Sequence, residues 1–310
     1  MNLKKPKFWD YKKPNIFAYL LYPLTILFKI ITLFSKNVTP QKFKIKTICV
    51  GNIYLGGTGK TSLSIKINNI LIKNNIKSCF IKKYYLNQID EQKILRNNGK
   101  LFLSSKRTEA IKQAEIENYE VAIIDDGLQD NSIDYDIKLL CFNNINWIGN
   151  GMTLPSGPLR ENINNLKYYD DVFLNGNLEN IEIIKKYILK INPKVRIHLG
   201  IYIPTNLNEL KRENNYFIFS GIGNHQTFIS MLKHNGVNIL KDIEFPDHYL
   251  YSRNDIEKIL VEAKNLKCEI LTTEKDYIRL DKNYSNQIKY IKSDLKIIDE
   301  ENFIKSVLLK

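Results

Sequence analysis

The stretch Gly51-Asn-Ile-Tyr-Leu-Gly-Gly-Thr-Gly-Lys-Thr61 stands between an apolar run, Ile45–Val50, and a helical stretch from about Lys60 to Lys73. A strand, a glycine-rich loop and a helix in this order are typical of a phosphate-binding loop. Glycines let the backbone approach a phosphate closely, and the first N–H groups of the helix point toward it. The stretch therefore predicts an α/β domain that binds a nucleotide.

The residues of this loop have separable expected roles. The backbone from Gly56 to Lys60 would wrap the phosphates, the Lys60 ammonium would reach the β- and γ-phosphates, and the Thr61 hydroxyl would bind magnesium. The nucleotide-binding candidates are Gly56, Gly57, Thr58, Gly59, Lys60 and Thr61. One position departs from the strict pattern, because Tyr54 stands where a glycine is expected five residues before Gly59.

A pair of carboxylates, Asp125-Asp126, follows the apolar run Val121–Ile124. Such a pair at the end of a strand holds the magnesium ion in phosphate-loop enzymes. An isolated acidic pair is more often part of a turn. In a chain that already contains a phosphate loop, we interpret Asp125 and Asp126 as metal ligands.

Short apolar runs alternate with helical stretches, which predicts parallel sheets with right-handed crossovers. Strands are expected at 45–50, 78–81, 121–124, 137–142, 216–219 and 269–271. In the second half, one helix should run from about His225 to just before Gly236. Ser252-Arg-Asn-Asp255 resembles a capping box and should open another helix.

Length and composition indicate a globular protein of about two domains. The chain has 310 residues, of which 44% are hydrophobic and 25% charged, and this composition excludes disorder and a multi-span membrane protein. Four cysteines are scattered without metal-ligand spacing and predict reduced, mostly buried thiols. We expect an N-terminal segment over residues 1–40, a phosphate-loop domain over 41–205 and a smaller α/β domain over 206–310.

The net charge of +13 first suggests a nucleic-acid partner, but its position along the chain favours another interpretation. Residues 1–46 contain ten lysines and one acid, a net charge of +9, which leaves +4 for the rest. Only seven basic residues are arginines, the usual readers of phosphates and bases. We therefore expect no nucleic-acid partner, although a basic nucleic-acid-binding ATPase remains an alternative.

The lysines surround an apolar segment, Ile16–Phe34, which as one helix would be about 28 Å long. Pro23 would kink this helix, and Lys29 lies inside it. A buried packing helix, a membrane span and a secretory signal are alternatives. We favour a helix in the interface of an anionic bilayer, with aromatic rings at headgroup depth and lysines near lipid phosphates.

Five motifs occur in order along the chain, and together they resemble the tetraacyldisaccharide 4′-kinase family of the lipid A pathway. They are Gly56-Gly-Thr-Gly-Lys-Thr61, Asp125-Asp-Gly-Leu-Gln129, Gly149-Asn-Gly-Met-Thr-Leu-Pro-Ser-Gly-Pro-Leu-Arg-Glu161, Phe245-Pro-Asp-His-Tyr249 and Thr273-Glu-Lys-Asp276. The resemblance implies transfer of the γ-phosphate of ATP, with Mg²⁺, to the 4′-hydroxyl of an acylated glucosamine disaccharide 1-phosphate. It implies a location on the cytoplasmic face of the bacterial inner membrane without a spanning helix.

The resemblance also implies roles for single residues. Asp90 would accept the hydroxyl proton and His248, from the second domain, would be its partner. Arg160 and Glu161 would contact substrate or phosphate, and Gln129 would lie near the magnesium and nucleotide. Without the family, Asp90 would be interpreted as a solvated loop acid and His248 as a packing histidine. The segment Thr273-Glu-Lys-Asp276 fits a capping cluster as well as a functional one.

Three departures from the family pattern concern the region around the site. The family's Asp-Asp-Gly-x-Gln-His run ends here in Asp130, and its Ser-Arg-Gly-Tyr segment appears as Lys82-Lys-Tyr-Tyr85. The stretch before Asp90 is shorter. Lys82 or Lys83 could supply the missing arginine's charge but not its two-pronged geometry. A phosphate-loop kinase or NTPase with another membrane or soluble substrate is therefore an alternative.

Overall fold

The computed structural model describes residues 5–34, 39–85, 88–284 and 286–308. The chain forms two compact units. One consists of Pro6–Gly200 with the chain from Ile297 onward, and the other is formed mainly by Ile201–Lys296. The sequence had suggested a border at 205/206 and a separate N-terminal segment. In the structure the border lies at 200/201, and the N-terminal helices and the C-terminal residues group with the larger unit.

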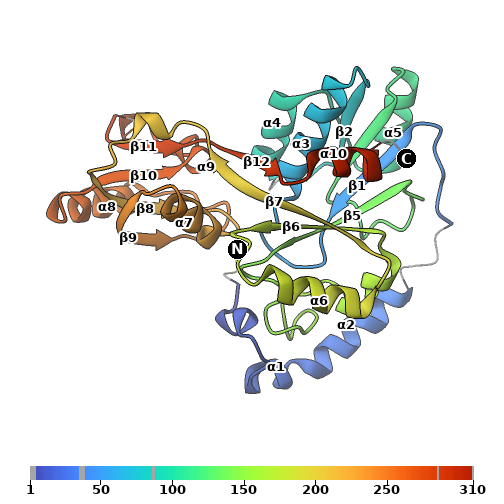
Figure 1. The fold of residues 1–310 in the computed structure, drawn as a ribbon. Helices are drawn as coiled ribbons and strands as arrows, with labels where there is room; N and C mark the ends of the chain where they lie inside the picture. The colour runs from blue at the N-terminus through green and yellow to red at the C-terminus, as the bar shows by residue number, and fades with distance from the viewer. Residues whose placement is uncertain (1–4, 35–38, 86–87, 285, 309–310) are drawn as a thin grey trace. The chain divides into compact units, whose positions relative to one another are not determined.

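The larger sheet has eight strands in the order β12-β7-β6-β5-β1-β4-β2-β3 (Figure 1). The strands are β1 (Lys46–Gly51), β2 (Ser78–Lys83), β3 (Leu101–Ser104), β4 (Val121–Asp125), β5 (Ile137–Asn143), β6 (Asp171–Gly176), β7 (Arg196–Pro204) and β12 (Ser293–Ile297). The pairs from β6 through β3 are all parallel. The predicted parallel α/β sheet is confirmed. The chain leaves the larger unit within β7 and returns at the end of β12.

Helices cover this sheet and complete its core. They are α3 (Lys60–Lys73), α4 (Ile89–Asn98), α5 (Arg107–Ile116), α6 (Ile181–Ile191) and α10 (Glu300–Phe303), with shorter turns η3 (Ile163–Tyr168) and η6 (Ile304–Leu308). Helix α3 packs on β1, β2 and β4, and α5 packs on β2 and β3. Because the central strands are buried on both faces, they are nearly continuous apolar runs, which made them readable in the sequence. The predicted burial of the cysteines also holds for Cys49, Cys79 and Cys141.

The register of β1 and β4 places the functional motifs together. Val50 pairs with Asp125, so both strands end at the same edge of the sheet. The glycine-rich loop leaves β1 at this edge, and Asp126 follows β4 there. The sheet thereby brings the phosphate loop and the acidic pair side by side.

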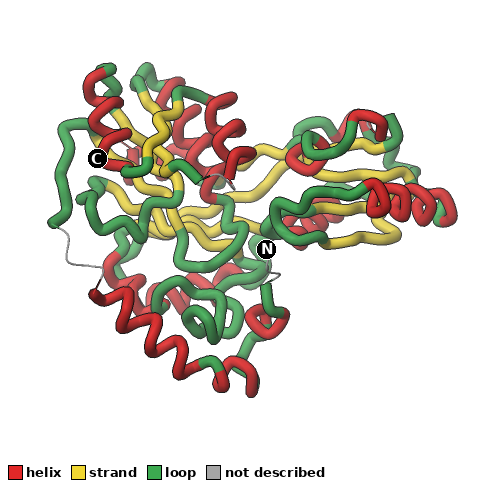
Figure 2. Tube along the Cα trace, turned by 180° about the vertical axis from the view of Figure 1, so that it is seen from behind, coloured by secondary structure: helices red, strands yellow, loops and turns green. Residues whose placement is uncertain are grey.

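The apolar N-terminal segment forms two helices instead of the single helix expected from the sequence. After the turn η1 (Lys7–Asp10), α1 covers Ile16–Leu20 and α2 covers Tyr22–Phe34, and both lie at the periphery of their unit (Figures 1 and 2). The break falls at Leu21, just before Pro23. Proline is tolerated in the first turn of a helix but not in its interior, so a new helix begins here. Among the described residues, no helix has the length and hydropathy required to cross a bilayer.

The smaller unit contains a four-stranded parallel sheet in the order β11-β10-β8-β9. Its strands are β8 (Asn215–Ser220), β9 (Asn238–Glu244), β10 (Glu269–Thr273) and β11 (Ile288–Ile291). Its helices and turns are η4 (Leu207–Glu209), α7 (His225–His234), α8 (Arg253–Asn265), α9 (Glu274–Tyr277) and η5 (Lys282–Tyr284). The predicted capping box is confirmed, because the side chains of Ser252 and Asp255 each accept from the other's backbone N–H.

Candidate active site

The phosphate loop presents an uncapped helix N-terminus. Gly59 is the N-cap of α3 with φ 80°, a left-handed conformation that favours glycine, and no side chain caps the helix. The first N–H groups of a helix have no partner within the helix, and the helix dipole adds positive potential there. This end of α3 therefore suits an anion such as a nucleotide phosphate.

Two asparagines hold the loop in this shape. The Asn52 amide nitrogen donates to Tyr54 O (2.6 Å), Gly56 O (3.3 Å) and Thr58 Oγ1 (2.8 Å). The Asn175 amide nitrogen, at the end of β6, donates to Thr58 O (2.7 Å). Both asparagines are fully buried. Neither role was predicted, because these hydrogen bonds depend on the folded course of the loop.

The two predicted metal ligands have different surroundings. The Asp125 carboxylate is fully buried and accepts from the hydroxyls of Thr61 (3.5 Å) and Ser64 (3.3 Å). Asp126 instead faces two cations, with Lys60 Nζ at 3.7 Å and the Arg160 guanidinium at 3.0 Å. Burial would raise the pKa of Asp126, but these two cations outweigh it and hold the pKa below its usual value.

A buried lysine joins Asp125 to helix α4. The Lys82 ammonium is 2.7 Å from Asp125 Oδ2 and 2.7 Å from Glu91 Oε2, and its side chain is only 2% exposed. Burial opposes the charged form, yet the two carboxylates raise the pKa of Lys82 above its ordinary value. The sequence had singled out Lys82 or Lys83 as a replacement charge, and the structure brings Lys82 into the site. The role of Glu91 was not predicted.

A second buried cation holds the loop after β4. Arg107 donates to the backbone oxygen of Asp126 (2.7 Å) and to the Asp130 carboxylate (3.0 Å). Burial would raise the pKa of Asp130, but hydrogen bonds from Ser132 and Arg107 lower it. Arg107 thus stabilises the left-handed backbone of Asp126, whose φ is 57°.

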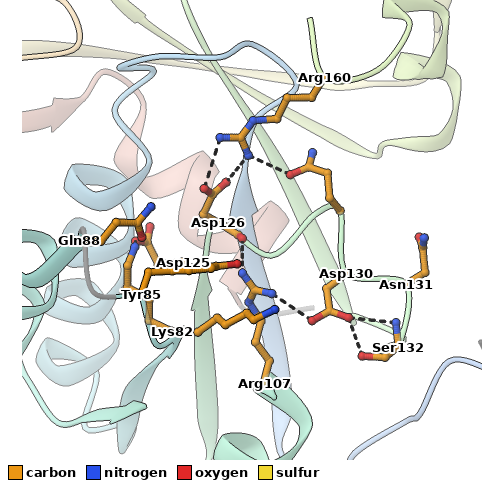
Figure 3. Close-up of a pocket in the computed structure, with 12 residues that line it drawn as sticks. Lys82, Tyr85, Gln88, Arg107, Asp125, Asp126, Asp130, Asn131, Ser132 and Arg160 are labelled. Carbon is orange, nitrogen blue, oxygen red and sulfur yellow. Dashed lines mark hydrogen bonds and ion pairs between the residues drawn. The ribbon is translucent and has the colours of Figure 1, made fainter. Parts of the chain in front are cut away.

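These groups line one cavity of about 570 Å³ (Figure 3). The lining residues are Lys82, Lys83, Tyr85, Gln88, Arg107, Asp125, Asp126, Gln129, Asp130, Asn131, Ser132 and Arg160. Figure 3 shows the Arg160 guanidinium reaching Asp126, and Arg107 lying between Asp126 and Asp130. Four cationic side chains and three carboxylates suit a polyanionic ligand that brings a divalent cation with it.

The motif that ends in Arg160 and Glu161 also reaches this cavity. Arg160 donates to the Gln129 side-chain oxygen (3.1 Å), and the Gln129 amide nitrogen donates to Asn52 O (2.9 Å). The Glu161 carboxylate accepts from Asn165 (2.8 Å) and from Gln129 (3.1 Å). Arg160 and Gln129 line the cavity directly, whereas Glu161 is hydrogen-bonded to Gln129 behind them.

Asp90 and His248 belong to different compact units, so their pairing remains a prediction. Asp90 lies in the first turn of α4, half-buried, next to Glu91. His248 has φ 58°, donates its backbone N–H to Gly221 O (3.1 Å), and lies with Nδ1 3.3 Å from the Arg279 guanidinium. A guanidinium only donates, so Nδ1 accepts and the ring proton of neutral His248 is on Nε2.

The segment Thr273-Glu-Lys-Asp276 has a structural role as a cap. The Thr273 side chain accepts from the backbone N–H of Asp276 at the start of α9. The buried Asp276 carboxylate accepts from Gly221 N (3.0 Å) and from the Tyr251 hydroxyl (2.9 Å). Asp276 therefore holds the loop after β8, which also contacts His248.

The site has donors suited to Mg²⁺. No group of three or more His, Cys, Asp or Glu side chains in the described part of the chain could hold a metal ion by itself. Magnesium is usually bound by one or two carboxylates together with phosphate oxygens and water. Asp125, Asp126 and the Thr61 hydroxyl provide such a set beside the phosphate loop.

Comparisons with known proteins agree with the geometry. The family model described as tetraacyldisaccharide-1-P 4′-kinase matches residues 17–310. A tetraacyldisaccharide 4′-kinase of Pelagibacter ubique (strain HTCC1062) is 57% identical, over 99% of this chain and 98% of the relative. The chain belongs to the tetraacyldisaccharide-1-phosphate 4′-kinase family. Like that family, it is a phosphotransferase that acts on a hydroxyl group in lipid A biosynthesis.

Other members of the 4′-kinase family also cover nearly the whole chain. A relative from Rickettsia canadensis (strain McKiel) is 32% identical over 96% of this chain and 94% of its own length. The crystal structure of LpxK from Aquifex aeolicus, described as an "apo" form in complex with ATP, covers 94% of this chain with a TM-score of 0.66 and 22% identity. That likeness shows a shared fold, in agreement with the predicted phosphate-loop α/β architecture.

Proposed function

We propose that this 4′-kinase binds MgATP at the phosphate loop, where Lys60 meets the cavity residue Asp126, and transfers its γ-phosphate to the 4′-hydroxyl of the acylated disaccharide 1-phosphate. One observation carries the proposal: the phosphate loop, Thr61 and both aspartates converge at the ends of β1 and β4. Phosphoryl transfer from MgATP uses this combination of an uncapped helix N-terminus, a lysine and carboxylates that hold the metal ion.

The chain's own groups would stabilise the transferring phosphoryl group by charge and position. The N–H groups at the start of α3 and the Lys60 ammonium bind the phosphates. The guanidinium of Arg160, hydrogen-bonded to Asp126 and Gln129, adds a positive charge to that of Lys60. When bound, Mg²⁺ would offset negative charge on the phosphates, held by Thr61, Asp125 and Asp126.

The acceptor hydroxyl must lose a proton during transfer. We assign this role to Asp90, with His248 as its partner. A carboxylate is a suitable proton acceptor in kinases, and a histidine with its proton on Nε2 can donate a hydrogen bond to it. The position of Asp90 next to Glu91, which Lys82 ties to Asp125, supports a role close to the phosphates.

The test compares phosphoryl transfer by Lys60→Ala, Asp90→Asn and His248→Ala with wild type in detergent micelles. The matched control is Lys73→Ala, which alters an exposed lysine in the last turn of the same helix. We expect losses of at least about 100-fold for the site variants, as is usual for general base and charge-stabilising groups. Full activity of Asp90→Asn would refute the base assignment, and full activity of Lys60→Ala would refute the nucleotide site.

We further infer that residues 5–30 dock on an anionic bilayer, at the cytoplasmic face of the inner membrane where ATP is present. The segment exposes many large apolar side chains, namely Tyr11, Ile16, Phe17, Tyr19, Leu20, Tyr22, Leu24, Ile26, Leu27, Phe28 and Ile30. An exposed apolar patch of this kind marks an interaction surface. Its flanking lysines favour anionic lipid, and docking there would bring the kinase to a membrane-embedded substrate.

Flotation with vesicles tests the docking. The full chain should float with vesicles of phosphatidylcholine containing phosphatidylglycerol. A variant with Leu20→Ser and Leu27→Ser, two exposed positions of this segment, should stay with the soluble fraction. The control is Ile116→Ser, an even more exposed apolar residue at the end of α5. Equal flotation of all three proteins would contradict the docking assignment.

A further inference from the structure

Tyr54 connects the phosphate loop to the N-terminal segment. This is the position where the strict loop pattern has glycine, but Tyr54 is not among the residues with positive φ and needs no glycine here. Its side chain is 1% exposed, and its hydroxyl donates to Asp10 Oδ1 (3.0 Å). A buried phenol that reaches another segment needs a partner of this kind. The tyrosine therefore fills a structural position that a glycine would leave empty.

The same N-terminal segment is bonded to the loop of residues 149–161. The Trp9 indole donates to Pro155 O (3.1 Å), and Asn150 N donates to Trp9 O (2.9 Å). The Thr25 hydroxyl, on α2, lies 2.7 Å from the Ser156 hydroxyl, and both are fully buried. A Cβ at Gly149 would lie 2.1 Å from Trp9 O, so the close approach of the two segments requires glycine.

The 149–161 loop in turn supports the nucleotide site. Leu55 N donates to Pro158 O (2.8 Å), and Arg160 N donates to Ile53 O (2.6 Å). The Arg160 side chain then reaches Asp126. The N-terminal segment, the 149–161 loop and the phosphate loop thus contact one another in a closed circuit of hydrogen bonds.

Apart from its buried contacts, the N-terminal segment is largely apolar and exposed, as Phe17, Leu24 and Phe28 illustrate. The segment is therefore bonded to the loops of the site through a few buried side chains, while its exposed remainder is the surface that we assigned to lipid. Docking of the segment on a bilayer would therefore affect those loops through the hydrogen bonds of Asp10, Trp9 and Thr25.

We propose that Tyr54 is a positioning residue that couples the lipid-facing segment to the nucleotide-binding loop, so that bilayer docking strengthens MgATP binding. The proposal rests on the bilayer docking proposed above. Linkage makes the coupling reciprocal, so MgATP also strengthens attachment to the bilayer. Tyr54 does not itself contact the reacting atoms. It positions the phosphate loop, which binds the nucleotide.

The experiment measures the dissociation constant of MgATP for the full chain by calorimetry, with and without phosphatidylcholine–phosphatidylglycerol vesicles. For wild type, we expect vesicles to tighten MgATP binding by about 5-fold or more, the lower end of allosteric couplings. Tyr54→Phe keeps the ring and removes the hydroxyl, and it should reduce this vesicle effect to less than about 2-fold. The control Tyr168→Phe, at a tyrosine that is 68% exposed, should retain the wild-type effect.

A second variant addresses the same bond from its other partner. Asp10→Ala should lose the vesicle effect as Tyr54→Phe does, and the double variant should lose no more than either alone. An unchanged vesicle effect in Tyr54→Phe would overturn the coupling, and so would wild type that floats without any change in MgATP affinity. Wild type that fails to float would instead overturn the docking on which the coupling rests.

Discussion

Lys82 is a buried cation whose removal should destabilise the fold. In Lys82→Met, the fully buried Asp125 and its neighbour Glu91 lose the ammonium that lies 2.7 Å from each. A buried carboxylate without its partner costs about 3–5 kcal/mol. We expect the free energy of unfolding, measured by chemical denaturation, to fall by about this amount.

Two further variants separate charge from packing at Lys82. Lys83→Met removes the neighbouring, half-buried lysine and should change the free energy of unfolding by less than about 1 kcal/mol. Lys82→Met with Asp125→Asn removes both charges and should recover part of the loss. If Lys82→Met were no more destabilising than Lys83→Met, the buried ion pair would not stabilise the fold, which would contradict this prediction.

Asp126 makes the stability depend on pH at the acid end. Lys60 and Arg160 lower its folded-state pKa despite burial, so the carboxylate is charged in both states above its ordinary pKa of about 4. The stabilisation that Asp126 gives to the folded protein is fully present above about pH 4 and is lost as the pH falls through the lowered pKa. In Asp126→Asn, the free energy of unfolding should decline less steeply below about pH 4 than in wild type. Identical slopes for the two proteins would contradict this.

The sequence was sufficient to predict those site residues whose roles follow from the residues next to them in the chain. Lys60 and Thr61 follow the loop glycines directly, and Asp125 and Asp126 follow a strand, so local order implies their place. The hydrogen bonds of Asn52 lie within its own loop but depend on how that loop folds, and Glu91 meets Lys82 only through the packing of α4 beside β2. No pattern of one chain could indicate them.

At the scale of elements, the junction between β1 and α3 depends on the Asn52 amide. Its three donated contacts hold the loop in the shape that receives phosphate. Asn52→Ala should raise the KM for ATP by about 10-fold or more, because lost hydrogen bonds of about 1 kcal/mol each leave the loop less ordered. Steady-state kinetics at saturating lipid substrate would measure this KM.

The control for Asn52 lies at the other end of α3. Asn74 is the C-cap, and its amide nitrogen donates to Ile70 O (2.8 Å). Asn74→Ala removes a similar side-chain hydrogen bond away from the phosphate loop, so the KM for ATP should stay within about 2-fold of wild type. Equal KM changes in the two variants would show that Asn52 stabilises the fold without ordering the loop.

Most strands buried on both faces were predicted, and those at the margins of the sheets were not. The buried strand β6 was also missed, because its apolar run is only three residues long, Val172–Leu174. β1, β4 and α3 lie close to their expected bounds because their apolar runs are long. β9 alternates between half-buried and exposed residues at the edge of its sheet, and β3 has only four residues. Such strands carry weak patterns. The break at Leu21 was expected only as a kink, because a proline can bend a helix or begin a new one.

At the scale of the whole molecule, the charge is concentrated beside the exposed apolar segment. Lys12 and Lys13 are exposed next to this segment. Each lysine near an anionic surface contributes about 1 kcal/mol, so Lys12→Gln with Lys13→Gln should weaken vesicle binding by about 10-fold or more at low salt. The difference should shrink at high salt because of screening. Quantitative flotation over a range of lipid concentrations measures both effects.

A matched pair of substitutions elsewhere tests whether position matters more than net charge. Lys112→Gln with Lys194→Gln removes the same total charge from exposed positions outside the N-terminal segment. It should leave vesicle binding within about 2-fold of wild type, because these lysines are not placed beside the apolar surface. Equal losses in both pairs would assign the attraction to the whole molecule and contradict a local docking segment.

The family and its activity were readable from the sequence because five motifs occur in one order along nearly the whole chain. The parallel sheet that this order implies is confirmed, and the family matches over residues 17–310. The pairing of Asp90 with His248 stays a prediction, since the two residues belong to separate compact units. The kinetics of Asp90→Asn and His248→Ala, described above, test the roles assigned to them.

The chemical identity of the product is the most direct test of 4′-kinase activity. Wild-type protein, MgATP and a tetraacylated glucosamine disaccharide 1-phosphate are incubated in mixed micelles, and the lipid is analysed by phosphorus and proton NMR. We expect a second phosphate on the 4′-oxygen of the lipid, with one ADP formed for each phosphate transferred and no product from Lys60→Ala. Phosphate on another hydroxyl, or ADP formed without any phosphorylated lipid, would contradict it.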